Sequence, residues 1–165
     1  MNESKTIELL LVEDNPMDLE LALRALRKAN VLNRVHVARD GVEALEFIFC
    51  EGPHAARRIS DRPKVILLDL NLPRINGLEV LKRVKGDVRT KMIPIVMLTS
   101  STKEADVIMS DNLGVNCYIV KPVNFAGFTK AVHDLGLDQA VHNLGLMTGL
   151  CGVTGWPRAA GRSRR

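Results

Sequence analysis

Short apolar runs alternate along the chain with segments whose apolar residues recur at helical spacing. The apolar runs cover residues 7–12, 34–38, 65–68, 94–98 and 117–120. The segments that follow them cover residues 16–30, 42–49, 78–84, 102–113 and 124–135. A period near 3.6 residues indicates helices, and short continuous apolar runs indicate buried strands. The pattern therefore predicts five strand–helix units and a parallel sheet covered on both faces, which is a doubly wound α/β fold.

Two segments depart from this pattern. Residues 51–63 contain two prolines and many charges, and they predict a surface loop. From residue 137 onward glycines are frequent, the helical signal is weak and the end is rich in arginine. We therefore expect one domain over residues 1–136 and a C-terminal extension over residues 137–165 that is partly disordered.

Composition and charge exclude several functional classes. The 46% hydrophobic content is enough for a core, and no apolar run approaches the roughly 20 residues that cross a bilayer. The net charge of +4 comes from the arginines of residues 139–165, which leaves the domain neutral. Cys50, Cys117 and Cys151 lack the spacing of a zinc site or a disulfide framework. These features favour a cytoplasmic protein and argue against binding to membranes or nucleic acid.

Residues that can do chemistry stand at the ends of four of the five apolar runs. They are Glu13 with Asp14, then Asp69, Thr99 and Lys121. Ligands of parallel α/β sheets bind beyond the carboxyl ends of the strands, so neighbouring strands would gather these groups in one pocket. Three carboxylates in one pocket repel each other unless a cation compensates them, and Mg²⁺ prefers such oxygen ligands.

This set of residues is suited to accepting a phosphoryl group. Asp69 stands alone after its strand and is the expected nucleophile, which would become an aspartyl phosphate. Glu13 and Asp14 are better placed to hold Mg²⁺. Lys121 supplies a fixed positive charge, and Thr99 supplies a hydroxyl donor, to balance the charge of the transferring group.

The same residues lie in motifs that resemble the receiver domain of two-component response regulators. The motifs are Leu-Leu-Val-Glu13-Asp14-Asn, Ile-Leu-Leu-Asp69-Leu-Asn71-Leu-Pro73, Asn76-Gly77, Val-Met-Leu-Thr99-Ser100-Ser101 and Tyr118-Ile-Val-Lys121-Pro122-Val. They occur in this order over about residues 7–135. The resemblance implies the flavodoxin-like receiver fold, in which the strand order is 2-1-3-4-5.

The resemblance also implies a role for each residue of the pocket. Asp69 would accept the phosphoryl group, and Lys121 would contact that group. Asp14 and Asp69 would bind Mg²⁺ directly, Glu13 would bind it through water, and Asn71 would contribute its backbone carbonyl.

Further positions would serve switching in a receiver. Thr99 would follow the phosphoryl group on activation, and Tyr118 would rotate inward behind it. Asn71 and Ser101 occupy positions that tune how long the phosphoryl group lasts. The peptide bond that precedes Pro122 would be cis, which suits a tight turn beside a site.

The implied function is that of a single-domain response regulator. It would take a phosphoryl group from a sensor histidine kinase and then switch its binding to a downstream protein. It would catalyse only its own Mg²⁺-dependent phosphorylation and dephosphorylation, so we do not expect an enzyme. Residues 51–63 and the segment PRINGLEVL resemble stand-alone receivers that partner bacterial phytochromes. A phytochrome-like kinase and a homodimer are therefore among the expected partners, although the sequence after Leu137 does not match the dimerisation segment of that subgroup.

Two other functional classes fit the sequence less well. A phosphatase of the haloacid-dehalogenase type also forms an aspartyl phosphate on a parallel sheet, but it needs a second acid two residues after the nucleophile. Asn71 occupies that position here. A nucleic-acid-binding regulator would need a binding module, and the neutral domain and short extension leave no room for a helix-turn-helix.

Overall fold

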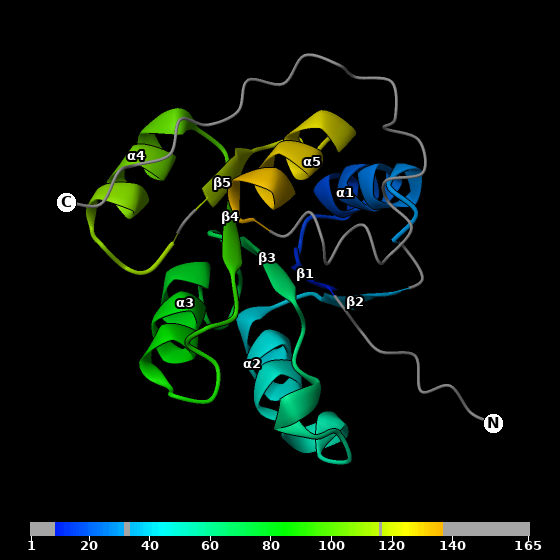
Figure 1. Ribbon diagram of the computed structural model, residues 1–165, viewed down its shortest axis with the longest axis vertical. Helices are drawn as coiled ribbons and strands as arrows, with labels where there is room; N and C mark the ends of the chain where they lie inside the picture. Colours follow the sequence, from blue (N-terminus) through cyan, green and yellow to red (C-terminus); the bar gives the residue numbers. More distant parts are fainter. Residues whose placement is uncertain (1–8, 32–33, 116, 137–165) are drawn as a thin grey trace.

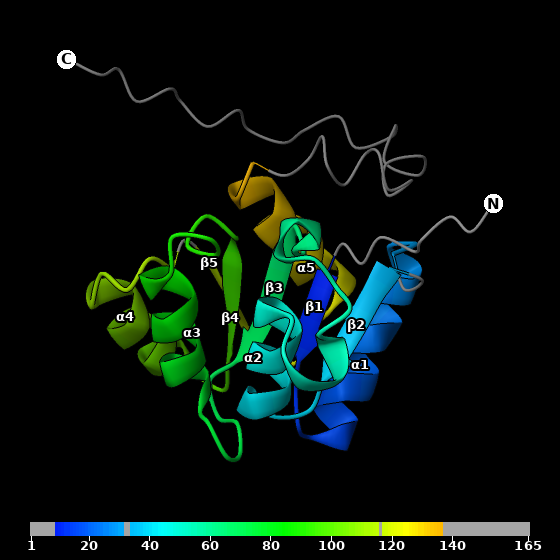
Figure 2. The ribbon, with the colours of Figure 1, turned by 90° about the horizontal axis from the view of Figure 1, so that it is seen from below.

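The described residues form a five-stranded parallel sheet with helices on both faces. The computed structural model describes residues 9–31, 34–115 and 117–136, so the extension predicted over residues 137–165 lies outside them. The strands are β1 (Leu9–Val12), β2 (Val35–Ala38), β3 (Val65–Asp69), β4 (Ile95–Thr99) and β5 (Cys117–Val120). Every neighbouring pair is parallel. The order β2-β1-β3-β4-β5, which can be followed across Figure 2, confirms the predicted order.

One helix follows each strand in the described part of the chain. The helices are α1 (Pro16–Lys28), α2 (Gly41–Phe49), α3 (Gly77–Gly86), α4 (Thr102–Ser110) and α5 (Phe125–Asp134). Helices α1 and α5 pack on one face of the sheet, and α2, α3 and α4 contribute to the core on the other (Figure 1). This arrangement confirms the doubly wound α/β fold. No helix of the described residues has both the length and the apolar character needed to cross a membrane.

The inner strands are buried on both of their faces. In β1, Leu9 and Leu11 pack in the cluster with α1 and α5, whereas Leu10 and Val12 pack in the cluster with α2 and α3. Strands β1, β3 and β4 are buried along their whole lengths. Double-sided burial explains why these strands read as continuous apolar runs, and it fixes the positions of their carboxyl ends.

Each of these helices begins with a polar residue whose side chain caps the first turn. The capping side chains, which accept hydrogen bonds from backbone N–H groups two or three residues further along the chain, belong to Asn15, Asp40, Asn76, Ser101 and Asn124. Such caps satisfy N–H groups that have no partner within the helix. Because the caps follow the strands closely, the first turns of the helices lie near the carboxyl edge of the sheet.

Two helices end earlier than the apolar spacing predicts. Helix α1 ends at Lys28 and α4 ends at Ser110. Beyond these ends, Asn30 (φ 61°) and Asn112 (φ 54°) adopt left-handed backbone conformations, which asparagine tolerates better than most residues. The apolar residues that follow pack against the core from turns.

The predicted loop over residues 51–63 contains more structure than its composition indicates. It includes short 3₁₀ helices at Gly52–His54 and Ile59–Asp61. The Arg57 guanidinium donates a hydrogen bond to the carbonyl of Phe47 and lies 3.6 Å from the centre of the Phe47 ring. This cation–π contact ties the loop to the end of α2.

At Gly77, helix α3 approaches the end of β3 closely. A Cβ atom at this position would overlap the carbonyl oxygen of Asp69, and that backbone cannot move without shifting the strand end. We expect Gly77→Ala to lower the free energy of unfolding by about 2–4 kcal/mol, as overpacking against backbone does. Urea denaturation would measure the change.

Gly86, at the other end of the same helix, is the matched control. A Cβ atom there would meet no other atom within 4 Å. Gly86→Ala should therefore change the free energy of unfolding by no more than about 1 kcal/mol. Equal effects of the two substitutions would contradict the close approach at Gly77.

Candidate functional site

The strand register brings the predicted site residues to one edge of the sheet. Val12 pairs with Leu68, so Glu13 and Asp69 lie level at the ends of β1 and β3. On the other side, β4 ends at Thr99, which pairs with the last residue of β5. Lys121 follows β5 directly, and its N–H donates to the carbonyl of Thr99 at 2.8 Å.

The ammonium group of Lys121 is the centre of the site. Its Nζ lies 2.8 Å from Asp69 Oδ2, 3.0 Å from Glu13 Oε2 and 3.2 Å from Asp18 Oδ2. The side chains of Asp69 and Lys121 are only 2% and 12% exposed. An ammonium has three N–H donors, so the three carboxylates found around it in the described part of the chain match its capacity.

The two buried carboxylates are also held by the backbone. Asp69 Oδ1 accepts a hydrogen bond from the N–H of Asn71 at 3.1 Å, and Glu13 Oε1 accepts one from the N–H of Asn15 at 3.1 Å. In each residue one oxygen thus faces a backbone donor and the other faces Lys121. The orientation of both carboxylates is fixed before any ligand arrives.

Glu13, Asp14 and Asp69 form a group that can hold a divalent cation. One carboxylate oxygen from each residue lies within 4.8 Å of the others, and Asp14 is exposed while the other two are buried. Hard oxygen donors in this number suit Mg²⁺, Mn²⁺ or Ca²⁺ rather than a soft metal. The exposed Asp14 leaves one side of the group open, so a cation there would remain accessible to a phosphate oxygen or to water.

Burial and the neighbouring charges of the site shift the pKa values of Glu13 and Lys121. Burial and, to a smaller extent, the hydrogen bond with Asp69 together raise the pKa of Glu13 to about 7, although the hydrogen bond with Lys121 lowers it. Burial alone would lower the pKa of Lys121, but its hydrogen bonds to Asp69 and Glu13 outweigh burial and raise it. The lysine therefore stays charged, and it compensates the carboxylates only in part. Repulsion from Asp69 contributes to the raised pKa of Glu13, but burial is its largest cause.

Thr99 and Ser101 are joined to each other. Thr99 is fully buried, and its hydroxyl donates to the backbone carbonyl of Ser101 at 2.8 Å. The Ser101 side chain caps α4 by accepting from the N–H of Glu104 at 3.3 Å. The hydroxyl expected in the pocket therefore has its hydrogen engaged in the β4–α4 loop in this structure.

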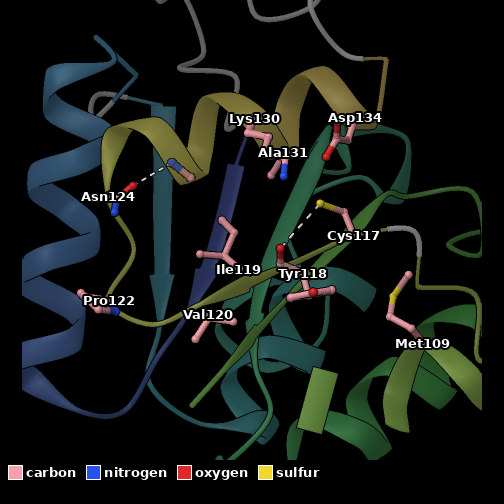
Figure 3. A pocket seen from close by; sticks show the side chains of 11 residues that line it. Met109, Cys117, Tyr118, Ile119, Val120, Pro122, Asn124, Lys130, Ala131 and Asp134 are labelled. Atoms are coloured by element: carbon pink, nitrogen blue, oxygen red, sulfur yellow. Dashed lines mark hydrogen bonds between the residues drawn. The ribbon is translucent and has the colours of Figure 1, made fainter. Parts of the chain in front are cut away.

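Tyr118 and Pro122 both lie beside a surface groove at β5. Along the strand, Cys117 and Ile119 pack in the cluster with α5, so Tyr118 points to the other face of the sheet. Tyr118 is 36% exposed and lines this groove of about 310 Å³ together with Met109 of α4 and Lys130 of α5 (Figure 3). The Lys121–Pro122 peptide bond is cis, as expected. The groove contains neither Asp69 nor the acidic residues around it, so it is a second feature of the surface and not the reactive site.

Sequence reasoning missed Asp18. This residue lies in the first turn of α1, and its carboxylate contacts Lys121 across 103 residues of sequence. The available signal was an acidic residue in the first turn of a helix that begins directly after Glu13 and Asp14. Such residues are usually explained by the helix dipole, so the signal had low weight.

A phosphoryl-accepting signalling domain has this architecture: the strand order β2-β1-β3-β4-β5, with the buried Asp69 at the end of β3 in contact with Lys121. The model of the response regulator receiver domain matches residues 9–133. The chain belongs to this family.

Comparison with individual proteins gives the same result. Response regulator Rcp1 of Synechocystis sp. is 40% identical over 127 residues, which are 77% of this chain and 84% of that protein. The bacteriophytochrome response regulator AtBRR is 52% identical, with a TM-score of 0.73, over 79% of this chain and 92% of that structure. The bacteriophytochrome response regulator RtBRR is 44% identical, with a TM-score of 0.74, over 87% of this chain and 94% of that structure. A Mn²⁺-bound form of Rcp1 is 36% identical, with a TM-score of 0.61, over 88% of this chain and 96% of that structure.

The raised pKa of Glu13 predicts a pH dependence of stability in the absence of metal. The folded state holds the Glu13 proton up to a pKa of about 7, whereas the unfolded chain releases it near the ordinary glutamate pKa of 4.5. The folded state thus binds more protons between these values, and stability falls as pH rises through this window. Relative to Glu13→Gln, the wild type should lose on the order of 2 kcal/mol between about pH 5 and pH 8.

Urea denaturation of both proteins with chelator present would measure this difference. Comparison with Glu13→Gln removes the contributions of titrating groups that lie away from Glu13, because these are shared by the two proteins. A difference in unfolding free energy that stays constant over this range would contradict the raised pKa.

Proposed function

We propose that Asp69 accepts a phosphoryl group from the phosphohistidine of a sensor histidine kinase, and that the aspartyl phosphate switches binding to a downstream protein. The observation that carries the proposal is the contact of 2.8 Å between Asp69 Oδ2 and Lys121 Nζ at a buried site with two further carboxylates. Membership of the receiver family supports the same function.

The geometry is suited to in-line transfer onto Asp69. An oxygen of Asp69 would attack phosphorus while the bond between phosphorus and the imidazole nitrogen breaks, and the histidine would keep the electron pair of that bond. The N–H of Asn71 holds Oδ1 and so fixes the plane of the carboxylate. Lys121 already lies at Asp69 and would donate to an oxygen of the incoming phosphoryl group.

Mg²⁺ is the cation we assign to the acidic group. Asp14 and Asp69 would bind it directly, Glu13 would bind it through water, and the backbone carbonyl of Asn71 would complete the set of protein oxygens. When bound, Mg²⁺ would neutralise charge on the transferring phosphoryl group. The oxygen-only donor set and the structure of Rcp1 with Mn²⁺ support a divalent cation here.

Switching would pass from Thr99 to Tyr118. On phosphorylation the Thr99 hydroxyl would leave the Ser101 carbonyl and donate to the phosphoryl group, and the Tyr118 ring would move inward from its exposed position. Because Tyr118 lines the groove between α4 and α5, this movement would reshape the groove for a downstream partner (Figure 3). Asn71 and Ser101 flank the site and would set the lifetime of the phosphoryl group.

A phytochrome-like histidine kinase is the phosphodonor that we propose. Two similar structures are named as bacteriophytochrome response regulators, and they are 44% and 52% identical to this chain. A homodimer is part of the same proposal, and its test is the oligomeric state before and after phosphorylation.

The experiment that tests this function measures phosphorylation of Asp69 in two arms. Purified protein with Mg²⁺ is incubated with a small phosphodonor such as acetyl phosphate, or with a phosphorylated phytochrome-like kinase. We expect a base-labile phosphoryl adduct on the wild type and none on Asp69→Asn, since the amide cannot act as the nucleophile. In the same samples, the NMR signals of Tyr118, the only tyrosine of the chain, should shift.

The matched control is Asp61→Asn, which removes an exposed carboxylate from the 3₁₀ helix at Ile59–Asp61, shortly before the amino end of β3, whereas Asp69 stands at its carboxyl end. It should be phosphorylated like the wild type. An adduct of equal yield on Asp69→Asn would overturn the assignment of the acceptor. Transfer from acetyl phosphate but from none of the phytochrome-like kinases tried would overturn the proposed kinase alone.

A further inference from the structure

Asp18 reaches the reactive site from a helix, not from a strand end. Its backbone N–H donates to the capping Asn15 side chain at 3.1 Å, which anchors the first turn of α1. Its carboxylate then lies 3.2 Å from Lys121 Nζ. The Asp18 side chain is 32% exposed, whereas those of Glu13 and Asp69, which contact the same ammonium, are nearly inaccessible.

Asp18 differs from the other partners of Lys121 in a second respect. The group of carboxylates that can share a cation consists of Glu13, Asp14 and Asp69, and it does not include Asp18. A cation bound there would draw on Glu13 and Asp69, two of the carboxylates that hold the lysine. Asp18 would keep its full charge for Lys121, because no other cationic partner of Asp18 is found in the described part of the chain.

We propose that Asp18 is a positioning residue that holds the Lys121 ammonium at Asp69 while the site carries its cation and the phosphoryl group. This inference rests on the function proposed above. Lysine has a flexible four-carbon stem with high rotamer entropy, so a free ammonium would sample many positions. A fixed charged acceptor on α1 limits that sampling, and it does so from a helix and not from a strand end.

Repulsion by the Asp18 charge would change the rate of phosphorylation in the opposite direction to positioning of Lys121. A negative charge near the pocket would repel an anionic phosphodonor, so its removal would speed phosphorylation. Positioning of Lys121 predicts instead that removal slows the reaction. Repulsion would make Asp18→Asn and Asp18→Ala equally fast, whereas positioning ranks them, because the amide oxygen of asparagine still accepts from an ammonium.

The test measures the rate of phosphorylation by acetyl phosphate at saturating Mg²⁺ in three variants. We expect Asp18→Ala to be slower than the wild type by about tenfold, and Asp18→Asn by only about threefold, since charge-assisted hydrogen bonds are about twice as strong as neutral ones. Glu20→Ala is the control: Glu20 lies on the same helix and carries the same charge, but it pairs with Arg24. Its rate should equal that of the wild type.

A second readout needs neither cation nor phosphodonor. In the metal-free protein, the NMR signal of the Lys121 ammonium protons should be visible in the wild type and in Glu20→Ala, because the group is held and shielded. In Asp18→Ala these protons should exchange with water at least about threefold faster, since one of three acceptors is lost. A structural role of Asp18 elsewhere on α1 would leave this signal unchanged.

The outcomes separate the inference from the proposed function. A wild type that is not phosphorylated, or an Asp69→Asn variant that is, would overturn the function and the inference with it. Phosphorylation on Asp69 together with an Asp18→Ala rate equal to or above that of the wild type would overturn only the positioning role. An unchanged ammonium signal in Asp18→Ala would do the same.

Discussion

One ammonium group shared among buried carboxylates is the interaction on which the site depends. Lys121 contacts Asp69, Glu13 and Asp18 within 3.2 Å, and the first two are almost completely shielded from water. Buried carboxylates are costly unless they are paired and hydrogen-bonded. A single positive charge cannot compensate them all, and the pKa of Glu13 is raised first by its burial and then by the neighbouring Asp69. The site is therefore prepared for a further cation, and a divalent one supplies the charge that is missing.

The rest of the fold holds this unfavourable arrangement in place. Strands β1, β3 and β4 are buried on both faces, so the residues at their ends have little freedom to separate. Backbone N–H groups two residues further on hold one oxygen of Glu13 and one of Asp69. Gly77 lets α3 approach the Asp69 carbonyl without a side chain between them. Packing energy from two apolar clusters thus offsets the electrostatic cost at one edge of the sheet.

The features that were predictable from the sequence are those set by periodicity and by chain order. Continuous apolar runs that each end in a polar residue placed Asp69 and Lys121 at the same edge, and the structure puts them in contact. The strand order came from the resemblance of the motifs, because periodicity alone does not say which strands are neighbours. Asparagine and proline at the start of α1 marked its first turn correctly.

The features that were missed depend on side-chain contacts between distant segments. Asp18 contacts Lys121 only because the fold brings the first turn of α1 within reach of a lysine that is 103 residues away in sequence, and no local pattern encodes that contact. The hydrogen bond of Thr99 to the Ser101 carbonyl depends on the local conformation of the β4–α4 loop. The loop over residues 51–63 is tied to α2 by the contact of the Arg57 guanidinium with the Phe47 ring. The composition of the loop indicates only that Arg57 is charged, not what it contacts.

The most direct test of the charge account is the number of protons released when Mg²⁺ binds. Calorimetric titrations at one pH, in buffers of different ionisation enthalpy, give this number. Because the Glu13 proton must leave for the cation to be held, release of up to about one proton is expected near pH 6, and it should fall towards zero near pH 9. Binding heats near pH 6 that do not depend on the buffer would show that no proton leaves, and they would contradict the raised pKa of Glu13.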